Sequence, residues 1–147
     1  MAWRELTEAD LLGVLNAYET DAYQSAAIGQ GQNPLADATG AVVNQCRGYI
    51  GDNPANQVAA GLTLPERVLL SALHLLRVEM LTRLDIEVSK DRAEAKRDAI
   101  RFFERVSDGK VQIEQPEGAT DNSGPQLTME TISSHDRQAT RENLAGL

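Results

Sequence analysis

Cysteine and aromatic residues are the scarcest components of this chain of 147 residues. The single cysteine, Cys46, excludes an internal disulfide and a cluster of thiolate ligands, and it is consistent with a reducing compartment. Aromatic side chains make up only 4% of the residues, so the core must be built from Leu, Val, Ile and Ala. Strand-like alternation of apolar and polar residues is nearly absent, and we therefore expect one all-α domain.

Basic residues are scarce at both ends of the chain, and the net charge is −8. Residues 1–60 carry seven acidic side chains against two basic ones, and residues 114–147 carry six against two. A protein that grips nucleic acid needs a basic patch to neutralise phosphates. This shortage argues against a helix-turn-helix nucleic-acid binder built on residues 7–28. It is compatible with a surface past which DNA slides without sticking.

Long apolar runs are absent as well. The most apolar stretch, residues 63–84 (TLPERVLLSALHLLRVEMLTRL), is short and is interrupted by charged residues, so it predicts no membrane span. The opening MAWRELTEAD places charges where a secretory signal needs an apolar run, and we expect neither a signal peptide nor a membrane association.

The same stretch predicts the central helix of a small bundle, because its apolar residues cover nearly the whole circumference. Around it we expect helices near 7–19, 34–50 and 89–108, each with one apolar stripe, and a short helix over 21–28 capped by Asp21. These elements predict a helical domain over 1–113, followed by an extended arm over 114–147, which is polar and rich in turn formers.

Local signals mark several helix ends. Thr7 is the expected N-cap of the first helix, without a full capping box, because Asp10 stands where Glu or Gln is usual. Ser89 and Gly109 mark the start and the end of the last helix. Residues 110–114 (KVQIE) predict either a short strand or an extended segment.

No catalytic, nucleotide-binding or metal-binding motif is present in the sequence. The glycines of GQGQNP, residues 29–34, follow no strand and predict a loop. His74 has no companion ligand, and we interpret it as a packed core side chain. Cys46 falls on an apolar stripe, which predicts a buried, inert thiol. We expect no enzymatic activity, no cofactor and no metal.

Candidate contact residues lie in three places. Trp3 is either an anchor at the edge of the core or a contact to a partner. The charged face of the helix near 89–108 is either solvated or part of a subunit interface. Its candidate residues are Arg97, Arg101 and Arg105. The arm carries three apolar outliers, Leu127, Met129 and Ile132, and we predict that it docks onto another chain.

One segment, residues 98–113 (DAIRFFERVSDGKVQI), is similar to the closing signature of a family of small proteins from Mu-like tailed phages. That signature is an Ala-Ile-aromatic/Leu-Leu-Glu pattern followed by a Ser/Asp-Gly-Lys-Val turn. The matching residues are Ala99, Ile100, Phe102, Phe103, Glu104, Gly109, Lys110 and Val111. The opening LTEADLLGVL and the stretch LPERVLLSALHLLRVEML also resemble that family. Residues 46–51 match its middle pattern only loosely, and the arm lies outside it.

The resemblance implies a head–tail connector, or head-completion, subunit of a virion. Such adaptors form a homo-oligomeric ring, commonly twelvefold, beneath the portal protein and above tail-side proteins, and they assemble in the host cytoplasm. DNA would pass through the ring, and the candidates for acidic channel walls are Glu5, Glu8 and Asp52. The alternative is a soluble helical protein-binding or regulatory domain with no viral role, which would use the groove beside the central helix.

Overall fold

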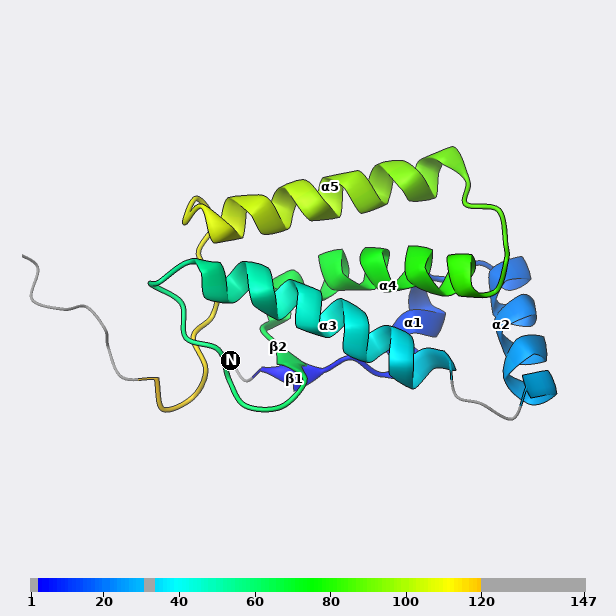
Figure 1. Ribbon diagram of the computed structural model, residues 1–147, viewed down its shortest axis with the longest axis horizontal. Helices are drawn as coiled ribbons and strands as arrows, with labels where there is room; N and C mark the ends of the chain where they lie inside the picture. Colours follow the sequence, from blue (N-terminus) through cyan, green and yellow to red (C-terminus); the bar gives the residue numbers. More distant parts are fainter. Residues whose placement is uncertain (1–2, 31–33, 120–147) are drawn as a thin grey trace, which may run out of the picture.

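The chain folds as an all-α protein, as predicted. The computed structural model describes residues 3–30 and 34–119, and Figure 1 shows its elements. In chain order they are β1 (Arg4–Glu5), α1 (Glu8–Val14), α2 (Ala17–Gln30), α3 (Pro34–Asp52), β2 (Thr63–Leu64), the 3₁₀ turn η1 (Glu66–Val68), α4 (Leu69–Arg83) and α5 (Lys90–Ser107).

Helix α4 is the centre of the bundle. Helices α3 and α5 both pack against it and against each other, and α1 packs against it as well. Nine of its fifteen residues are buried, among them Leu76, Met80 and Leu81. A helix that is apolar on nearly all sides is stable only when neighbours cover it, and this arrangement supplies them. The predicted central helix is therefore confirmed.

The start of that helix was predicted wrongly. Thr63 and Leu64 form β2 and pair antiparallel with β1, where Arg4 faces Leu64 and Glu5 faces Thr63. Pro65 follows in an extended conformation, and only after the turn η1 does α4 begin, at Leu69. Burial of this helix on every side was also expected and is not complete, since Leu70 is 61% exposed.

Helix α5 is amphipathic and lies along α3 and α4 with its apolar stripe inward. Ala99, Phe103 and Val106 of that stripe are buried. Both predicted ends are confirmed. The Ser89 side chain accepts a hydrogen bond from the Arg92 N–H, and Gly109 just beyond the helix has a φ of +75°, a conformation that glycine adopts without strain.

The N-terminal helices differ from the prediction. A capping box does form at Thr7: its side chain accepts from the Asp10 N–H, and the Asp10 carboxylate accepts from the Thr7 N–H. Arg4 also donates to the Asp10 carboxylate, at 2.8 Å, and helps to hold it at the start of the helix. Helix α1 ends at Val14, and α2 begins at Ala17 rather than at Asp21.

The long connection between α3 and β2 and the segment after α5 close the other end of the bundle. Arg47 of α3 donates to the carbonyl oxygens of Ala59 and Thr63, which fixes that connection on the helix. Of the two alternatives for residues 110–114, the structure has the extended segment, with Val111 and Ile113 buried in the core.

Candidate interaction surfaces

A buried ionic cluster joins α2 to α4 and α5. The carboxylate of Glu19 accepts from Arg77 at 3.3 Å and from Arg92 at 3.1 Å, so one negative charge lies between two positive ones. The side chains of Glu19 and Arg77 are only 7% and 8% exposed, whereas that of Arg92 is 24% exposed. Glu19 also accepts from the Asn16 N–H, and Asn16 accepts from the Glu19 N–H, which makes a reciprocal cap for α2.

The cluster keeps Glu19 ionised in spite of its burial. Burial alone raises the pKa of a carboxyl group, but the Asn16 N–H, the hydrogen bond from Arg92 and the charges of both arginines outweigh it and lower the pKa of Glu19. The cluster is thus a structural joint that links α2 to α4 and α5 at the end of the bundle where Figure 1 shows α2.

His74 lies on α4 one turn before Arg77. Burial, with the charges of Arg77 and Arg92, lowers the pKa of His74. Among the described residues, its Nδ1 is a buried nitrogen without a hydrogen-bond partner. The ring is therefore neutral at physiological pH, in keeping with the packed core side chain that we expected. Within residues 3–30 and 34–119, no group of His, Cys, Asp and Glu could hold a metal ion.

Cys46 is fully buried in α3, as its position on the apolar stripe predicted. Burial raises the pKa of its thiol to about 12. A thiol that remains protonated at neutral pH and meets no solvent is a poor nucleophile and a poor metal ligand. Cys46 is a core residue here.

Trp3 anchors the two ends of the described chain to each other. Its indole N–H donates to the carbonyl oxygen of Glu114 at 2.9 Å, and its ring packs against the core. The Glu114 carboxylate accepts from the Arg67 N–H, and the Gln115 side chain bonds Asn56 and the backbone N–H of Gln57. The anchor interpretation of Trp3 fits these contacts. Because these bonds involve Glu114 and Gln115, the folded part of the chain continues beyond residue 113.

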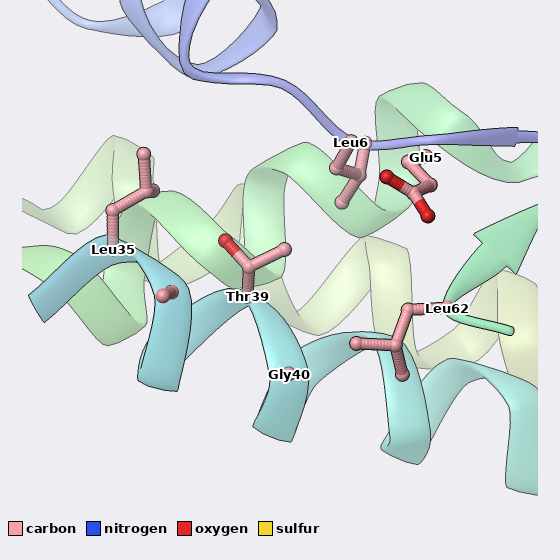
Figure 2. Close-up of a pocket in the computed structure, with 7 residues that line it drawn as sticks. Glu5, Leu6, Leu35, Thr39, Gly40 and Leu62 are labelled. Carbon is pink, nitrogen blue, oxygen red and sulfur yellow. The ribbon is translucent and has the colours of Figure 1, made fainter. Parts of the chain in front are cut away.

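A groove opens between β1 and the first half of α3. It is lined by Glu5, Leu6, Leu35, Ala36, Thr39, Gly40 and Leu62 and has a volume of about 260 Å³. Figure 2 shows the side chain of Leu6 pointing from the N-terminal segment toward α3, where Leu35, Thr39 and Gly40 form the opposite wall. Leu62, at one end of the groove, is 44% exposed. Local sequence patterns do not predict this surface, because its walls come from three separate segments.

The predicted charged face of α5 is exposed, and its ion pairs are loose. Arg97 lies 4.0 Å from Glu94, and Arg101 lies 3.6 Å from Asp98, with all four side chains at least half exposed. Arg105 is exposed near the end of the helix. Such pairs contribute little to stability, so this face is free to stay solvated or to meet another subunit.

The three acidic channel candidates lie on different elements. Glu5 belongs to β1 and lines the groove, and Glu8 starts α1, where it accepts a hydrogen bond from the Tyr23 hydroxyl at 3.3 Å. Asp52 is the last residue of α3 and is exposed. The arm candidates Leu127, Met129 and Ile132 lie outside the described residues.

Two large apolar side chains on α2 face solvent, a feature that sequence periodicity did not indicate. Tyr18 is 71% exposed and Ile28 is 85% exposed, while Tyr23 between them is buried. Single exposed apolar residues are common in soluble proteins. Two on one helix at the end of the bundle are a candidate contact surface.

Among the described residues, no helix is both long and apolar enough to cross a bilayer. Comparison with family models, with characterised proteins and with solved structures finds no match to this chain. The function must therefore be argued from the residues and their arrangement.

Proposed function

We propose that this protein is a structural, non-enzymatic subunit of a homo-oligomeric ring, a head–tail connector that joins the portal of a tailed-phage virion to the tail. The proposal begins with the resemblance of residues 98–113 to the closing signature of such proteins. The opening and central stretches that resemble the same family correspond to α1 and α4, which pack together.

The observation that carries the proposal is the place of that signature in the fold. Its apolar positions are not a surface motif: Ala99, Phe103 and Val111 are buried in the core, and Ile100 and Phe102 are partly buried against it. Gly109 reverses the chain at the end of α5, so that the extended segment returns to Trp3. The residues that carry the resemblance thus determine how α5 ends and how the chain after it packs against the core. A match at positions with such a role in the structure supports a shared fold.

The surfaces also suit a ring subunit. The exposed Tyr18 and Ile28 of α2 and the exposed charges of α5 lie on separate elements. A ring needs two different faces on each subunit, because each copy contacts the next head to tail. In this proposal α2 belongs to one face and the charged side of α5 to the other.

Acidic side chains line the channel in this proposal. Glu5, Glu8 and Asp52 are the candidates to face DNA, since acidic walls repel phosphates and keep a duplex moving. Exchange of Glu5 and Asp52, which are both exposed, for lysine should slow DNA ejection from particles. Ejection at the normal rate would remove these residues from the channel.

The test of the ring is the mass of the particle in solution. Light scattering on the full chain, alone and mixed with the neighbouring portal protein, should give a closed oligomer in at least one of the two samples. A protein that stays monomeric at all concentrations and never joins the portal contradicts the proposal.

The second candidate function is a soluble helical protein-binding domain. The groove between β1 and α3 favours it, since an apolar groove on a small domain is a common site for a peptide or helix of another protein. A stable monomer that binds a non-viral partner through Leu6, Leu35 and Leu62 would establish this candidate instead.

A further inference from the structure

The groove between β1 and α3 is an apolar surface without a covering group among the described residues. Leu6 and Leu35 form its walls, and Leu62 is nearly half exposed at one end. Over Gly40 the space is open, since a Cβ built there would meet nothing within 4 Å. Apolar surface of this kind gains free energy when another apolar group covers it.

The size of the groove indicates what kind of group fits. Its volume of about 260 Å³ lies below the range of roughly 300–1,000 Å³ typical of pockets that enclose small molecules. It is also open along one side, between the N-terminal segment and α3 (Figure 2). A row of two or three aliphatic side chains from a peptide segment matches it better than an enclosed ligand does.

The sequence of the arm supplies such a row. Between residues 120 and 143, the only large apolar side chains are Leu127, Met129 and Ile132, within six residues of one another. The chain around them is polar and cannot bury them in a core of its own. Apart from Glu5, the groove is uncharged, and Glu130 is the one charged residue between 122 and 134. The match is therefore apolar rather than electrostatic.

The arm also begins at the right place. The Glu114 carbonyl is bonded to Trp3, two residues before Glu5 at the edge of the groove. From Gln115 to Leu127 there are twelve residue steps, which span up to about 40 Å when extended. That reach exceeds the whole of α3, whose 19 residues make a helix of about 28 Å. The groove is therefore within reach of the arm of the same copy.

We propose that this groove is the seat of residues 126–132 (QLTMETI) of the arm. The apolar fit does not require the ring. The further statement that a neighbouring copy donates the arm rests on the proposed function, because it requires adjacent copies, which the proposed ring would supply.

Cysteine cross-linking in the full-length chain tests the seat. Leu62→Cys combined with Met129→Cys should form a disulfide under mild oxidation, since a disulfide needs Cα atoms within about 7 Å. The native Cys46 is fully buried and does not compete. The matched control is Lys96→Cys with Met129→Cys, because Lys96 is exposed on α5, away from β1 in Figure 1. Equal yields from the two pairs, or no disulfide in either, would overturn the proposal.

A second measurement avoids oxidation. Leu62→Cys alone should react slowly with a thiol reagent in the full chain. Replacing Leu127, Met129 and Ile132 with serine should then raise the rate by about tenfold or more, the factor that corresponds to loss of 1.4 kcal/mol of docking. These three residues lie outside the described fold, so the folded core should be unchanged. An unchanged rate would count against the seat.

Whether the disulfide joins two chains or lies within one chain distinguishes the binding of the arm in the groove from the formation of a ring. Disulfides between chains support both the seat and a donated arm. A disulfide only within one chain supports the seat and removes the arm from the ring contacts. If light scattering shows a ring but no disulfide forms, the arm does not bind in the groove, and the proposed connector function is not contradicted.

Discussion

Helices α5 and α2 are attached to the same central helix by different physics. Helix α5 lays a buried stripe of Ala99, Phe103 and Val106 along α3 and α4. Helix α2 is held at the end of the bundle through Glu19, whose carboxylate lies between Arg77 and Arg92, and through the buried Tyr23. The attachment of α5 is spread over several apolar side chains. The attachment of α2 depends mainly on the single negative charge of Glu19, with Tyr23 as its apolar contact.

This difference determines what each attachment responds to. Apolar contacts are non-directional and carry no charge, so the attachment of α5 depends on how well its buried side chains fill the core and not on the charge of any one group. A buried charge is held only while its partners are present, because an unpaired charge away from water is strongly unfavourable. Helix α2 should therefore respond to single charge changes and to pH in ways that α5 does not.

The largest effect should come from the core under α5. Phe103 is fully buried and stacks on Tyr49 of α3 with ring centroids 5.8 Å apart. Phe103→Ala should lower the free energy of unfolding by about 3–5 kcal/mol, since it removes the ring and leaves a cavity. Urea denaturation followed by circular dichroism measures this loss. Phe102→Ala is the matched control, because Phe102 is only partly buried and should cost less. Equal losses would show that Phe103 does not anchor α5.

The next effect tests the ionic joint. Glu19→Gln keeps the shape of the side chain but leaves two guanidinium groups without a counter-charge. We expect a loss of about 3 kcal/mol, at the low end for a buried pair because Arg92 is partly exposed. Hydrogen exchange should show α2 losing protection before α5. The control is Glu79→Gln, whose exposed pair with Arg83 should be worth less than about 0.5 kcal/mol. Similar results for the two variants would contradict the joint.

Acid should loosen the same joint in two steps. The folded pKa of His74 is below its ordinary 6.5, so the unfolded chain takes up that proton first and stability falls as pH drops below 6.5. The folded pKa of Glu19 is below its ordinary 4.5, so its contribution is present above pH 4.5 and is lost as pH falls further. Urea midpoints between pH 7.5 and 3 measure both steps. His74→Gln should remove the upper step, and Glu19→Gln should reduce the lower one, which Asp10 shares because Arg4 lowers its pKa. An upper step that survives in His74→Gln would contradict this assignment.

The smallest effect concerns the start of α2. Asn16→Ala removes one half of the reciprocal cap with Glu19 and should cost about 1 kcal/mol. The exposed cap of α5 provides the control, since Ser89→Ala should cost a similar amount. Hydrogen exchange should place the two losses in different helices. If both variants weaken α5 alone, Asn16 does not cap α2.

The sequence predicted the apolar part of this fold well and the ionic part poorly. The stripe of α5 and its ends at Ser89 and Gly109 follow from local patterns, so they could be read directly. Glu19 and its partner Arg77 are 58 residues apart, and no local pattern connects them. Two signals were present: Asn16 and Glu19 stand at the spacing of a capping box, and Arg77 interrupts an apolar helix, where a buried charge requires a partner.

The candidate surfaces were also only partly predictable. The sequence left Trp3 open between an anchor at the edge of the core and a partner contact, and it did not indicate the bond of Trp3 to the Glu114 carbonyl. The groove depends on the pairing of β1 with β2, which displaced the predicted start of the central helix from Thr63 to Leu69. Pairing of two-residue strands carries almost no sequence signal, because their contacts are set by the packing around them.

The bond between Trp3 and Glu114 has a mechanical consequence. Any tension applied to the chain beyond residue 119 is first transmitted to Gln115 and Glu114, whose bonds run to three separate segments around Asn56, Arg67 and Trp3. Behind them, Val111 and Ile113 are embedded in the core. The load is therefore shared by the loops and the N-terminus before it reaches α5, and the helices can stay folded while the arm bears force.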